Sequence, residues 1–264
     1  QQDIIMTAID NVVAYRDGFG EVEFEKPPDV FVFMGGDNGF LSLIVQPDVK
    51  TFADLEGRQV AVDAMTTGYA FVLRKLLQEG GVDEEKLEFV SVGGALQRFR
   101  AMMGGQYAGS VLMTPFDIMA EAEGFSALSK AINVIGDYQG VVGAARQGWA
   151  DRHPHILIRY ISAYRESLAW LYDRSNKSEA IAILRANLPQ LPEKFSEAIY
   201  QTVLADEGGL ERGANLNPLG LEKVLRLRKE FGSESFLPGS IQRYYNSLYF
   251  ESAVESSQSA NLVN

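Results

Sequence analysis

The chain of 264 residues carries a formal net charge of -11, contains no cysteine and is 46% hydrophobic. This composition is typical of a globular protein with one large domain or two smaller ones. The negative charge repels the phosphate backbone of nucleic acids, so we expect no nucleic-acid partner. The lack of cysteine excludes disulfides, thiolate zinc sites and a cysteine nucleophile.

Short apolar segments alternate with segments of helical spacing through the first 150 or so residues. Strands are expected at residues 3–8, 30–34, 40–45, 60–64, 87–92, 109–113 and 141–145. Helices are expected between them, at residues 9–17, 68–79, 95–103 and 116–123, several of them followed by glycine. This alternation predicts an α/β protein with mainly parallel sheets flanked by helices.

The C-terminal part has a different pattern, in which helical spacing recurs and no strand alternates with it. Helices are expected at residues 155–173, 177–187, 192–204 and 218–231. We therefore expect a helical C-terminal part beside the α/β part.

The segment VAVDAMTTGYAFVLRKLL, residues 60–77, changes its period in the middle. It alternates like a strand before Met65 and shows a helical stripe after Gly68. Thr66 and Thr67 therefore lie at a helix N-terminus, where a hydroxyl caps free N–H groups and glycine allows close approach of a ligand. The helix dipole would favour an anion there. A plain N-cap and a ligand site both remain open.

Small or hydroxyl-bearing residues also follow three other predicted strands. Because ligands in α/β sheets bind beyond the carboxyl ends of the strands, these strand ends indicate one polar cavity. Arg98 and Arg100 are expected to face solvent, so N–H groups and hydroxyls would hold an anion, and a neutral heteroaromatic ligand is equally compatible. The predicted ligand-binding residues are Thr7, Asp10, Thr66, Thr67, Gly68, Gly94, Thr114 and Tyr138.

Three segments resemble, in order, those of one protein family. They are DIIMTAIDNVVAY (residues 3–15), KTFADLEGRQVAVDAMTTGYAFVLRKLLQEGGV (residues 50–82) and ALQRFRAMMGGQYAGSVLMTP (residues 95–115). They resemble the periplasmic substrate-binding proteins of ABC importers, in the class that binds nitrate, sulfonates, taurine or thiamine-pyrimidine precursors. The resemblance covers nearly the whole chain.

The resemblance implies a type II periplasmic-binding-protein fold, in which two α/β lobes close on a ligand by hinge motion. It places the first lobe in residues 1–42 and 141–264, the second lobe in residues 43–140, and the crossings at residues 41–45 and 141–145. Family members carry a strand, a helix, a strand and a helix before the segment that matches Asp3. The resemblance therefore implies that this part of the first lobe is missing from the sequence.

The function implied by the resemblance is that of the solute-binding component of an ABC importer. Such a protein binds a small organic molecule, here anionic or heteroaromatic, and delivers it to a permease in the membrane. We expect a monomer, periplasmic or extracellular and associated with the membrane, with no catalytic residue, metal or cofactor.

Other functions remain open on the same fold. An enzyme acting on a small aromatic or carboxylate substrate could use Asp10, Asp63 or Asp117 as an acid. The histidines, His153 and His155, flank a proline and indicate a solvated turn. A regulatory effector-binding domain can reuse the fold, but such domains follow a DNA-binding head, which the sequence does not contain. A sensor role attached to a membrane protein also remains open, and conversion of the ligand to a product would indicate an enzyme.

Overall fold

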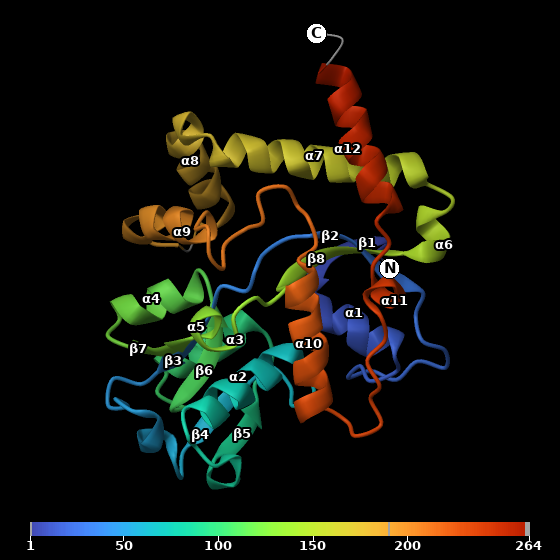
Figure 1. The fold of residues 1–264 in the computed structure, drawn as a ribbon. Coiled ribbons are helices and arrows are strands. Elements are labelled where there is room, and N and C mark those ends of the chain that lie inside the picture. The colour runs from blue at the N-terminus through green and yellow to red at the C-terminus, as the bar shows by residue number, and fades with distance from the viewer. Residues whose placement is uncertain (1, 190, 262–264) are drawn as a thin grey trace.

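A computed structural model describes residues 2–189 and 191–261, and its strands form two separate sheets (Figure 1). The three-stranded sheet has the order β1–β8–β2, with bounds β1 (Ile4–Ala8), β8 (Val141–Arg146) and β2 (Val30–Gly35). The five-stranded sheet has the order β5–β4–β6–β3–β7, with bounds β5 (Glu88–Ser91), β4 (Gln59–Val62), β6 (Gly109–Met113), β3 (Leu41–Val45) and β7 (Ser126–Lys130). The two-lobed α/β fold is confirmed.

Both sheets contain antiparallel strands, so the expectation of mainly parallel sheets was wrong. Strand β4 runs parallel to β5 and β6. Strand β3 is antiparallel to β6 and β7, and β8 is antiparallel to β1 and β2. The reason is that β3 and β8 each enter their sheet directly from the other lobe. Each begins beside the carboxyl ends of neighbouring strands and therefore runs in the opposite direction to them.

The chain passes between the two sheets at residues 36–40 and 136–140, which we call the hinge segments. The strands expected to cross between lobes each lie within one sheet, and the crossings come immediately before them. The hinge segments are bonded to each other, because the Gly140 N–H donates to the Asp37 carbonyl at 3.0 Å. The lobe boundaries at residues 42 and 140 stay predictions.

The helices of the second lobe flank its five-stranded sheet. They are α2 (Gly68–Glu79), α3 (Ala95–Met103), α4 (Phe116–Ala122) and α5 (Ala131–Ile135). The predicted bounds of α2 are confirmed, since its apolar stripe, including Leu73 and Leu76, is buried. Short 3-10 turns complete this lobe, among them Phe52–Leu55, which begins with a capping box formed by Thr51 and Asp54.

The remaining helices belong with the three-stranded sheet. They are α1 (Ile9–Arg16), α6 (Gln147–Ala150), α7 (Pro154–Tyr172), α8 (Lys177–Asn187), α9 (Ser196–Val203), α10 (Pro218–Phe231), α11 (Ile241–Tyr244) and α12 (Leu248–Asn261). Helices α7 and α12 cross above this sheet, whereas α10 runs beside α1 and reaches α2 (Figure 1). In the described residues no helix combines the length and the apolar character needed to cross a bilayer.

One continuous cluster of buried apolar side chains connects the lobes. It contains Ile9 of α1, Val32 of β2, Leu73 of α2 and Leu221 of α10. On the side of α1, α2 and α10 the lobes are therefore held by a dry core, and any polar group there must find a partner inside the protein.

Candidate functional site at the junction of the lobes

The N-terminus of α2 is capped by Thr67, as the change of period predicted. Its Oγ1 accepts a hydrogen bond from the Ala70 N–H at 3.3 Å and lies 2.6 Å from the Asp63 carboxylate, to which it donates. Thr67 therefore uses its hydroxyl inside the protein, as an N-cap.

Gly68 is required because an internal carboxylate lies against it. Asp10, in the first turn of α1, accepts a hydrogen bond from the Gly68 N–H. A Cβ at position 68 would lie 2.7 Å from the Asp10 Cβ and 2.8 Å from the Tyr138 Oη. The anion at this helix N-terminus is thus a side chain of the other lobe.

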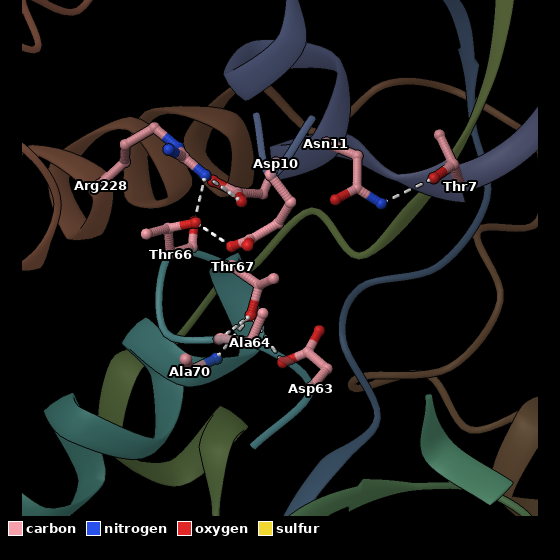
Figure 2. Close-up of polar contacts among 10 residues, drawn as sticks. Thr7, Asp10, Asn11, Asp63, Ala64, Thr66, Thr67, Ala70 and Arg228 are labelled. Carbon is pink, nitrogen blue, oxygen red and sulfur yellow. Dashed lines mark hydrogen bonds and ion pairs between the residues drawn. The ribbon is translucent and has the colours of Figure 1, made fainter. Parts of the chain in front are cut away.

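Arg228 of α10 pairs with Asp10 through two nitrogen atoms on one edge of its guanidinium group (Figure 2). The distances are 2.7 Å from Nε to Oδ1 and 2.5 Å from Nη2 to Oδ2, and Nη2 also donates to the Thr66 carbonyl at 2.9 Å. Both charged side chains are almost completely buried, with 2% and 1% exposed. Burial raises the pKa of Asp10, and the Arg228 guanidinium and the Gly68 N–H offset part of this increase.

Tyr138, in the second hinge segment, completes this arrangement. Its Oη is buried and has no hydrogen-bond partner among the described residues, and burial raises the pKa of the phenol well above its ordinary value. We call Asp10, Thr66, Gly68, Tyr138 and Arg228 the junction. It ties both lobes and α10 together by one ion pair and its hydrogen bonds.

Polar side chains of both lobes lie beside the junction on its more exposed side. Asn11 donates to the Thr7 hydroxyl at 2.9 Å in the first lobe, and both side chains are half-buried. In the second lobe Asp63 is half-buried, and the Thr66 hydroxyl is exposed and contacts Glu21. Figure 2 shows Thr7 and Asn11 next to Asp10, with Thr67 and Asp63 below them.

The other two predicted site residues, Gly94 and Thr114, do not belong to the junction. Gly94 is exposed at the N-cap position of α3, where its carbonyl accepts the Arg98 N–H. Thr114 is buried and lies 3.4 Å from the Asp117 carboxylate, next to a separate cavity.

Arg98 does not face solvent as expected, because it is only 3% exposed. It donates to the Gly93 carbonyl at 2.7 Å and the Val111 carbonyl at 3.3 Å, and burial lowers its pKa. Arg100 is exposed, as predicted.

Arg228 was not among the predicted site residues, although the sequence contains a signal for its burial. Arg228 lies four residues after Val224 and seven after Leu221, on the apolar stripe of its helix. An arginine at such a position predicts a buried charge that requires a partner.

The histidines are remote from the junction. His153 and His155 lie at the start of α7, and the His153 ring contacts Trp149, with 5.3 Å between ring centroids. Within residues 2–189 and 191–261, no three His, Asp or Glu side chains are grouped so as to hold a metal ion.

Several solved structures share this fold. One is the periplasmic nitrate-binding protein NrtA from Synechocystis PCC 6803, with a TM-score of 0.75 and 14% identity, covering 96% of this chain and 74% of that one. Another is the alkanesulfonate-binding protein SsuA from Xanthomonas axonopodis pv. citri bound to MOPS, with a TM-score of 0.70 and 14% identity, covering 93% and 80%. The desulfurization enzyme DSZB is also similar, with a TM-score of 0.65 and 12% identity, covering 96% and 85%.

At these identities the similarity shows the fold alone. No curated protein matches the chain. A family model described as NMT1/THI5 like matches residues 35–178, which is more than half of the sequence. The chain therefore belongs to the NMT1/THI5-like family.

Proposed function

We propose that this protein is the solute-binding component of an ABC importer, which binds a small organic molecule between its lobes and delivers it to a membrane permease. Family membership and the fold shared with nitrate-binding and alkanesulfonate-binding proteins support this proposal. The protein would act as a monomer in the periplasm or outside the cell, associated with the membrane through the permease, with lobes at residues 1–42 and 141–264 and at residues 43–140.

The observation that carries the proposal is that polar side chains of both lobes lie next to the junction, near the carboxyl ends of β1 and β4 (Figure 2). In this proposal the ligand contacts Thr7 and Asn11 of the first lobe and Asp63 and Thr66 of the second. The remaining predicted residues of this region position the lobes, since their polar groups are engaged inside the protein or buried.

The junction also narrows the class of ligand. Asp10 fills the position at the α2 N-terminus that an anionic ligand would occupy. The hydroxyl and amide groups that remain, together with the Asp63 carboxylate, suit a neutral polar molecule, such as a heteroaromatic one, better than an anion.

The ligand can be identified by native mass spectrometry of protein purified without refolding. We expect a small molecule to co-purify and to bind again when added to the stripped protein in calorimetric titration. A bound molecule that contacts only one of the two lobes in the structure of the complex would contradict the proposed site.

Replacing Thr66 with valine should lower the affinity for that molecule by about ten- to a hundred-fold, or ~1–3 kcal/mol, with little effect on stability. The reason is that the Thr66 hydroxyl is exposed and caps no helix. Thr67→Val is the matched control, because it should lower the free energy of unfolding by ~1 kcal/mol through loss of the cap. Wild-type affinity in Thr66→Val, measured by calorimetry, would exclude Thr66 from the site.

An enzyme is the second candidate, because the desulfurization enzyme DSZB has this fold. A solute-binding protein releases its ligand unchanged, whereas an enzyme converts it to a product. Incubation of the protein with the identified molecule should leave it unchanged, as followed by mass spectrometry. Formation of a product would replace the transport function by catalysis.

A further inference from the structure

A cavity lies between the lobes, away from the junction. It has a volume of about 530 Å³, within the range of small-molecule sites. The five-stranded sheet and the helices that flank it contribute Ser42, Asp117, Lys130 and Asn133, and the first lobe contributes Gln201 and Glu207 from α9 and the loop after it.

The hinge separates this cavity from the junction. Its lining includes Gly39 and Phe40 of the first hinge segment and no residue of the junction. In Figure 1, α4 and α9 lie to the left of the hinge segments, whereas α1 and α10 lie to the right. A molecule in this cavity would therefore not share the site proposed above.

Asp117 is the one strongly buried charge that lines the cavity. Its side chain is only 8% exposed, and Oδ1 accepts the Ile118 N–H at 2.8 Å. Oδ2 has only two long contacts, each of 3.4 Å, with the hydroxyls of Ser42 and Thr114. No cation in the described part of the chain forms an ion pair with it, and burial raises its pKa. The carboxylate therefore retains an acceptor and lacks a counter-ion.

We propose that this cavity is a second small-molecule site, which binds an organic monoamine with Asp117 as the counter-ion of the ammonium group. Lys130 lines the same cavity and forms no ion pair with any residue that the structure describes. It repels a second positive charge and attracts a carboxylate, which favours an amino acid over a polyamine. Because the two walls belong to different lobes, the bound amine favours the closed arrangement.

Three four-carbon probes test this proposal by saturation-transfer NMR and titration: n-butylammonium, 4-aminobutyrate and butyrate. We expect 4-aminobutyrate to bind most tightly, n-butylammonium next, and butyrate at least about tenfold more weakly than 4-aminobutyrate. Equal binding of butyrate, or no binding of either amine, would overturn the proposal.

Single-residue variants test which side chains bind the amines. Asp117→Asn should weaken both amines about tenfold or more, whereas Glu121→Gln, which removes an exposed carboxylate from the same helix, should change them less than about twofold. Lys130→Gln should reduce the affinity of 4-aminobutyrate to that of n-butylammonium, which keeps the test valid if Asp117→Asn misfolds. Thr66→Val should leave amine binding unchanged, so the two sites fail independently. Equal loss in Asp117→Asn and Glu121→Gln would refute a site at Asp117.

Discussion

Replacing Arg228 with methionine is expected to lower the free energy of unfolding by about 3–5 kcal/mol. The substitution leaves the Asp10 carboxylate buried with the Gly68 N–H as its remaining donor, and it removes the donor from the Thr66 carbonyl. Methionine fills much of the same space over Phe71, so the loss reports on the unpaired charge more than on packing. Urea denaturation followed by circular dichroism measures the change.

Two further variants separate the ion pair from other effects. Arg226→Met removes an arginine from the same helix whose side chain is 74% exposed, and it should change stability by less than ~0.5 kcal/mol. Adding Asp10→Asn to Arg228→Met removes the unpaired charge and should restore a large part of the lost stability. A loss in Arg228→Met no larger than in Arg226→Met would show that the pair does not hold the lobes together.

Local features of the fold could be predicted from the sequence because they depend on neighbouring residues. The bounds of α2 and the cap by Thr67 follow from an apolar stripe and a hydroxyl within a few positions of each other. The bounds of α8 and α10 were predicted for the same reason. In contrast, β7 was missed, because the polar segment SALSK becomes a strand only by pairing with β3 at the sheet edge.

The content of the site could be predicted less well, because it depends on pairs distant in the sequence. Asp10 and Arg228 are separated by 218 positions, and nothing near Gly68 identifies the group that approaches it. The sequence indicated an anionic ligand at the N-terminus of α2, whereas the structure places the Asp10 carboxyl group there. That the anion is Asp10 required the tertiary structure.

Asp37, in the first hinge segment, is another buried carboxylate, and it has no cationic partner in the described part of the chain. Asp37 is 2% exposed, and its oxygens accept the Gly39 N–H at 2.8 Å and the Val141 N–H at 2.9 Å. The Asp37 side chain thus links the first hinge segment to β8, the strand that follows the second hinge segment. Burial raises its pKa from the ordinary value of 3.8 to about 6, although both N–H groups lower it.

Because the pKa is raised in the folded state, Asp37 should make the protein more stable as the pH falls from 7 toward 4. Between pH 3.8 and about 6 the folded protein holds a proton that the unfolded chain releases, so its contribution to stability grows by at most on the order of 3 kcal/mol. In Asp37→Asn this contribution is absent. The difference in free energy of unfolding, wild type minus Asp37→Asn, should therefore increase as the pH is lowered, as measured by urea denaturation at several pH values.

Asp206→Asn, at a side chain that is 85% exposed, should follow the wild-type profile. Parallel profiles for wild type and Asp37→Asn would mean that Asp37 titrates as an ordinary surface carboxylate, and that the hinge does not respond to pH through it.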